Sequence, residues 1–97
     1  MVSEITVVQP TGLLDSVNGN KLRREIGDLI NSQAIHILID FQNIDFMDSS
    51  GLSSLVMILK SVKEVNGSLR LGNLNEQIRM LLQLTAMDSI FQIEPTP

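Results

Sequence analysis

Two hydroxyl groups and a carboxylate stand together in the segment Phe46-Met47-Asp48-Ser49-Ser50-Gly51-Leu52, directly before an apolar helical pattern. A helix that begins here has unpaired backbone N–H groups and the positive end of its dipole, so anions are favoured. A phosphate on one of these serines would be held by those N–H groups and would add about −1.5 to −2 charge to the surface. The same residues also suit a plain helix cap, because Ser and Asp are common caps for structural reasons alone.

Other chemistries find less support. A serine hydrolase would need a base beside Ser49, but the only histidine, His36, lies in an apolar run typical of a strand, and no Gly-x-Ser-x-Gly turn is present. His36 is better explained as a strand residue with a hydrogen-bonded ring nitrogen. Asp40, Asp45 and Asp48 lack the ligand set of a calcium loop, and the chain has no cysteine. We expect no catalytic residue and no metal site.

Composition narrows the class of protein. The 97 residues are 43% hydrophobic and 19% charged, which suits one soluble domain and leaves no length for a second. The net charge is −4, with no basic stripe and no tryptophan or tyrosine, so nucleic-acid binding is not expected. Apolar stretches are too short to span a bilayer, and no basic region precedes an apolar run at the N-terminus. We therefore expect a cytoplasmic protein with no membrane insertion.

Strand and helix patterns alternate along the chain. We expect strands at about residues 4–9, 35–39, 68–72 and 90–93, with a bend at Pro10 and Gly12 and a connection over residues 40–47. The nearly continuous apolar run at 35–39 is typical of a central parallel strand covered on both faces.

Three helices are expected between these strands. The first runs from a cap at Asp15 or Ser16 to about residue 31, the second spans 50–65, and the third follows a capping box of Asn73 and Glu76 and ends near 84. Each helix has an apolar stripe that is expected to face inward. In the first helix it consists of Leu22, Ile26, Leu29 and Ile30, and in the second of Leu52, Leu55, Val56, Leu59 and Val62. In the third it consists of Ile78, Leu81 and Leu82. Such alternation predicts an α/β fold with right-handed crossovers and a mainly parallel sheet, in which sites form where strands lead into helices. Residues 45–52 are that junction.

A wider string strengthens the phosphorylation hypothesis. Residues 40–55, reading Asp-Phe-Gln-Asn-Ile-Asp-Phe-Met-Asp-Ser-Ser-Gly-Leu-Ser-Ser-Leu, closely resemble the signature of the STAS family. Gly12-Leu13-Leu14-Asp15 resembles a family turn, and residues 81–91 resemble its late helix-to-strand segment. The resemblance implies a single STAS domain of the SpoIIAA-like kind over residues 1–97, with a small, mainly parallel or mixed sheet and packed helices.

Within that family the chain is most similar to bacterial anti-sigma factor antagonists. The resemblance implies that Ser49 is phosphorylated, and it leaves open whether Ser50 is used instead. The unphosphorylated domain would bind an anti-sigma factor that is also a serine kinase, and so free the sigma factor. A PP2C-type phosphatase would restore the binding form, and no cofactor would belong to this chain. A STAS subunit of a lipid-transport complex, or of partner switching without a sigma factor, is the alternative.

The partner surface is expected around the same loop, at Asp15, Asp48, Ser50, Gly51, Ser53 and Met57. Small side chains on the solvent side of the second helix, Ser54 and Ser61 among them, would let a partner helix approach closely, although both suit an ordinary solvated face as well. The resemblance places Asp15 beside the Ser49 loop, where a plain helix cap also explains it. Ser53 replaces a glycine that many of these antagonists carry.

Many family members have an extra N-terminal strand and a final C-terminal helix. The chain is therefore expected to be shortened at both ends, which would leave some apolar surface uncovered. A homodimer could cover such a surface.

Overall fold

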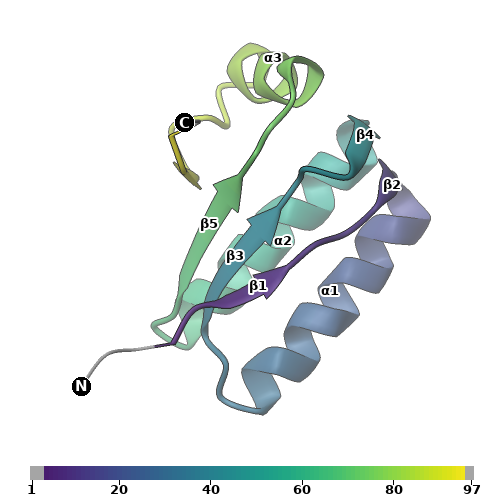
Figure 1. Ribbon diagram of the computed structural model, residues 1–97. Coiled ribbons are helices and arrows are strands. Elements are labelled where there is room, and N and C mark those ends of the chain that lie inside the picture. Colours follow the sequence, from purple (N-terminus) through teal and green to yellow (C-terminus); the bar gives the residue numbers. More distant parts are fainter. Residues whose placement is uncertain (1–3, 96–97) are drawn as a thin grey trace.

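The computed structural model describes residues 4–95 and contains strands and helices in alternation (Figure 1). The strands are β1 (Thr6–Val8), β2 (Gly12–Leu14), β3 (His36–Asp40), β4 (Ile44–Met47), β5 (Ser68–Gly72) and β6 (Gln92–Ile93). The helices are α1 (Ser16–Asn31), α2 (Ser49–Glu64) and α3 (Glu76–Leu84). The α/β class predicted from the sequence is confirmed.

The strands form two parallel sheets. The larger has the order β1-β3-β5-β6, and the smaller joins β2 to β4. Val7, Leu38, Arg70 and Gln92 lie in one row across the larger sheet. β3 has neighbours on both edges, so its predicted place inside the sheet is confirmed.

Both long helices lie on the same face of the larger sheet (Figure 1). The strand order proceeds steadily from β1 through β3 to β5, so two right-handed crossovers place α1 and α2 side by side on one face. Ile37 and Ile39 of β3 are buried beneath them, whereas Leu38 on the opposite face is only half-buried. The expectation that β3 is covered on both faces is therefore wrong for the described residues, because no described helix packs on the second face.

The small sheet was not predicted. The bend expected at Pro10 and Gly12 and the connection expected over 40–47 in fact contain β2 and β4. Gly12 pairs with Ile44 and Leu14 with Met47, with a shift in register between Gly12 and Leu13. Gly12 has φ +84° and its N–H donates to the Asn43 carbonyl at 2.9 Å. Strands of three and four residues give little periodic signal, and these form because two segments about 30 residues apart meet.

The start of α3 differs from the predicted capping box. Asn75, not Asn73, is the cap, and its side-chain oxygen accepts a hydrogen bond from the Ile78 N–H at 2.9 Å. Asn73 adopts a left-handed conformation (φ 55°) and donates to Asp40 at 2.9 Å. Two asparagines close together both suit a cap, and the path of the chain out of β5 decides between them.

α2 begins one residue before the predicted start, and its buried face differs in part. Leu52, Leu55 and Val62 are buried as expected, and Val56 and Leu59 are half-buried against the core. Ile58 and Ser54 are also buried, although neither was placed on the inward stripe. The stripe is wider than expected because α2 packs against α1 as well as the sheet.

Candidate functional site

The starts of α1 and α2 lie side by side. Because Leu14 of β2 pairs with Met47 of β4, the next residues, Asp15 and Asp48, come together where the two strands lead into helices. Each carboxylate caps its helix, Asp15 accepting from the Asn18 N–H and Asp48 from the Gly51 N–H, both at 2.9 Å. Asp15 therefore lies beside the Ser49 loop, as the family resemblance implies, and it is also a helix cap.

Small residues allow this close approach. Gly51 is buried, and a Cβ atom there would overlap the carbonyl oxygen of Leu14. A Cβ on Gly19 of α1 would overlap the Ser54 hydroxyl. Ser54, 6% exposed, therefore packs against α1 and presents little surface to solvent, which corrects the expectation for this serine. Gly51 is likewise buried by packing within the chain.

Ser49 is exposed and is the first residue of α2. Ser50 is exposed as well. Among the described residues, Asp48 takes up the Gly51 N–H, while the backbone N–H groups of Ser49 and Ser50 have no acceptor. An anion on the Ser49 hydroxyl would therefore find two free donors and the positive ends of two helices nearby, opposed by the Asp15 and Asp48 carboxylates.

A shallow groove between α1 and α2 adjoins Ser49. Ser50, Ser53 and Met57 line its α2 side, and Ser16, Asn20 and Arg23 line its α1 side, with Ser54 between them. Ser53 is exposed and Met57 is 42% exposed. The structure thus brings Ser50, Ser53 and Met57 to one surface, as expected, whereas Ser61 lies farther along the helices in a separate pocket.

Exposed apolar side chains occur on the chain segments next to the two caps. Leu13 and Phe46 are paired in register in the small sheet, and they are 51% and 48% exposed. Val17, in the first turn of α1, is 62% exposed. The pairing of Leu13 with Phe46 could not be read from the sequence, since it depends on the unpredicted contact of β2 with β4.

Two carboxamides at the start of α3, the cap Asn75 and Gln77, also hold the strand that leads into the site, and the sequence reasoning missed both. Gln77 makes two hydrogen bonds to the backbone of Met47, and Asn75 donates to the Ile44 and Asp45 carbonyls. The partners are about 30 positions apart in the chain, so no local pattern could have indicated them.

Asp40, Asp45 and Asp48 do not come together in a group that could bind a cation. Asp40 accepts from the Asn73 amide, the Gln42 N–H and the Gln9 amide, and these hydrogen bonds, that of Asn73 foremost, lower its pKa. Asp48 is occupied as a cap. No group of three potential ligand residues is found within residues 4–95.

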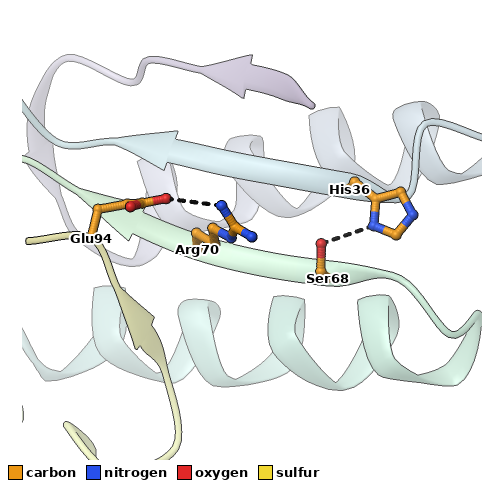
Figure 2. Close-up of polar contacts among 4 residues, drawn as sticks. All are labelled: His36, Ser68, Arg70 and Glu94. Carbon is orange, nitrogen blue, oxygen red and sulfur yellow. Dashed lines mark hydrogen bonds and ion pairs between the residues drawn. The ribbon is translucent and has the colours of Figure 1, made fainter. Parts of the chain in front are cut away.

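His36 lies away from Ser49. It begins β3, and its Nδ1 atom is 2.8 Å from the Ser68 hydroxyl of β5 on the uncovered face of the sheet (Figure 2). The prediction of a hydrogen-bonded ring nitrogen is confirmed. The same face holds an ion pair between Arg70 and Glu94 at 3.2 Å. The β4–α2 junction follows the opposite, carboxyl end of β3, so His36 is not placed to act on Ser49.

None of the helices in residues 4–95 combines the length and apolar character that crossing a bilayer requires.

Comparisons with known proteins agree with this architecture. A model of the STAS domain matches residues 2–97. The anti-sigma-B factor antagonist of Bacillus subtilis is 33% identical over 89% of this chain and 78% of its own length. The anti-sigma F factor antagonist of Paenibacillus polymyxa is 28% identical, over 94% of this chain and 76% of its own. A crystal structure from Thermotoga maritima superposes with a TM-score of 0.88 at 27% identity, covering 99% of this chain and 83% of that one.

Proposed function

The chain belongs to the STAS domain family, and on that premise we propose that it is an anti-sigma factor antagonist, a binding switch set by phosphorylation of Ser49. The observation that carries the proposal is the position of Ser49. Its side chain is exposed in the first turn of α2, directly after the cap Asp48 and three residues after the exposed Phe46. A kinase can reach such a hydroxyl, and a docked partner would cover it.

The surface around Ser49 suits a protein partner. Leu13 and Phe46 precede the two caps in β2 and β4, Val17 follows the first cap, and all three are exposed and apolar. The groove with Ser53 and Met57 adjoins the start of α2. Apolar side chains gathered at the surface next to small polar ones are typical of protein interfaces.

Phosphorylation would change the charge of this surface most where a partner must come closest. A phosphate adds about −1.5 to −2 charge beside Asp15 and Asp48, which are already at the site. In a packed interface the added charge must lose its water, and a penalty of only about 1.4 kcal/mol weakens binding tenfold. The free N–H groups of Ser49 and Ser50 would stabilise the phosphate in the unbound domain and so favour release further.

The partners proposed are an anti-sigma factor with serine kinase activity and a PP2C-type phosphatase. Support for the first comes from the similar proteins, which are named as antagonists of anti-sigma factors. The kinase and phosphatase roles follow from the family resemblance of the Asp48-Ser49-Ser50-Gly51 string. The chain itself is proposed to be no enzyme, since its only histidine contacts Ser68, away from Ser49.

The test is phosphate transfer and partner capture. Immobilised wild-type chain, Ser49→Ala, Ser49→Asp and Ser61→Ala are each incubated with extract of the source cells and ATP, and bound proteins and modified residues are identified by mass spectrometry. Ser61 is a matched control, since it is exposed on the same helix outside the site and its hydroxyl donates to the Met57 carbonyl.

We expect phosphate on Ser49 in the wild type and in Ser61→Ala, none on residue 49 of Ser49→Ala, and persistent capture of a kinase-type ATPase by Ser49→Ala. Ser49→Asp should bind that ATPase at least about tenfold more weakly. Equal affinity of Ser49→Ala and Ser49→Asp would refute the switch. Phosphate on Ser50 would move the acceptor by one residue, and an unmodified chain that captures transport proteins would favour the role of a subunit in another assembly.

A further inference from the structure

The outer edge of β4 is hydrogen-bonded by two side chains at the start of α3, Gln77 and the cap Asn75. Gln77 accepts a hydrogen bond from the Met47 N–H at 2.9 Å and donates one to the Met47 carbonyl at 2.8 Å. A carboxamide has the donor, acceptor and planar geometry of a peptide group, so Gln77 pairs with Met47 as a residue of a neighbouring strand would. Asn75 supports the same edge through bonds of 3.2 Å to the Ile44 and Asp45 carbonyls.

The peptide bond between Met47 and Asp48 is held from two sides. Its carbonyl oxygen accepts from Gln77, and its N–H donates to the Leu14 carbonyl at 3.2 Å. Because a peptide group is planar, these two bonds together determine its orientation. The next residue is the cap Asp48 and the one after it is Ser49, so α3 on one side and β2 on the other orient the start of α2.

We propose that Gln77 is a positioning residue for the modification of Ser49, through which α3 controls how well the serine is presented to the kinase. The inference rests on the proposed function, since it concerns the same hydroxyl. Gln77 is half-buried, its hydrogen bonds go to Met47 and not to Ser49, and it does not line the groove. Its effect is on the geometry of the acceptor, because phosphoryl transfer depends on in-line alignment of the attacking oxygen.

The requirement for a carboxamide gives the proposal a signature that bulk or stability alone would not give. Gln77→Ala loses both hydrogen bonds and leaves the Met47 N–H and carbonyl without partners. Gln77→Glu, when ionised, can still accept from the N–H but cannot donate to the carbonyl. Once protonated at low pH, the same side chain can do both, so both hydrogen bonds to Met47 should form again.

The first measurement is hydrogen exchange of backbone amides by NMR on the free chain. Gln77→Ala should lower the protection factor of the Met47 N–H by about tenfold or more. The Ile39 amide in β3 reports global unfolding and should change less. Gln77→Glu should show low Met47 protection at pH 7 and recover at acidic pH. Gln83→Ala, an exposed glutamine on the same helix, is the matched control and should leave Met47 protection unchanged.

The second measurement is phosphorylation of each variant with ATP and the kinase fraction retained by immobilised Ser49→Ala chain. Gln77→Ala should lower the maximal transfer rate about tenfold, with a smaller change in the chain concentration that gives half that rate. Gln83→Ala should behave as wild type.

The outcomes are distinguishable. A wild-type rate for Gln77→Ala, or Met47 protection equal to wild type, overturns the positioning role while the proposed function stands. Equal losses of rate in Gln77→Ala and Gln83→Ala also overturn it. A wild-type chain that takes no phosphate overturns the proposed function, and the positioning role with it. The exchange data would still report the hydrogen bonds between Gln77 and Met47.

Discussion

Two polar regions of this domain are organised in opposite ways, namely the β4–α2 junction and the uncovered face of the larger sheet. At the junction, side chains bind backbone groups that no ladder holds, as Asp48 does with Gly51 and Gln77 with Met47. On the sheet face, Arg70 pairs with Glu94 and His36 with Ser68 above strands whose backbones are already paired (Figure 2). Substitutions should therefore have large effects at the junction and small ones on the sheet face.

The largest effect is expected for Gly51→Ala. Alanine is normally the better helix residue by about 1 kcal/mol, but here its Cβ would overlap the Leu14 carbonyl oxygen and lie 2.8 Å from the carbonyl carbon. The start of α2 would have to move away from β2, so we expect a loss of about 3 kcal/mol in the free energy of unfolding, measured by urea denaturation.

Gly27→Ala is the control, since a Cβ there meets nothing within 4 Å in the middle of α1. It should be neutral or should stabilise the domain by up to about 1 kcal/mol. If both glycine variants had the same stability, the close contact at the junction would be refuted.

Asp48→Ala should have the next largest effect. It removes the acceptor for the Gly51 N–H at the start of α2, which costs about 1 kcal/mol of stability in thermal or urea unfolding. Asp48→Asn keeps an acceptor and should recover most of that loss. Comparable destabilisation by both variants would show that charge, not capping, is what matters here.

Asp40 stands between the two regions, at the end of β3, where it joins the β5–α3 turn to the end of β1. The pKa of Asp40 lies below the usual 3.8, chiefly because of the hydrogen bond from the Asn73 amide. The ionised carboxylate therefore stabilises the folded state at pH values above 3.8. This contribution is lost as the pH falls through the lowered pKa. Asp40→Asn should reduce stability at pH 7 and flatten its decline in acid. Asp88→Asn, at an exposed aspartate, is the control. If the stability of Asp40→Asn declined in acid as steeply as that of the wild type, the role given to Asp40 would be contradicted.

The smallest effect is expected for the Arg70–Glu94 ion pair. Its side chains are 44% and 37% exposed, so water and salt screen the attraction. Glu94→Gln should lower stability by less than about 0.5 kcal/mol, and 1 M salt should remove the difference. A loss as large as that of Asp48→Ala would remove the contrast between the two regions.

Much of the fold was predictable because its signals are local. Apolar spacing located α1 and α2, the run at 35–39 marked the inner strand, and the string around Ser49 indicated the family. Asp15 and Asp48 stand three residues before the N–H groups that they cap, a relation that sequence spacing expresses directly.

What the sequence alone determined, then, is where the three helices and the strands of the larger sheet lie approximately, and that a hydroxyl stands at the start of α2. Tertiary structure alone decided that β2 pairs with β4, that Ser54 is buried against Gly19, and that Gln77 holds Met47. The physical reason is that these contacts join backbone and side-chain groups about 30 or more positions apart, and their energies depend on a distance that no local pattern encodes.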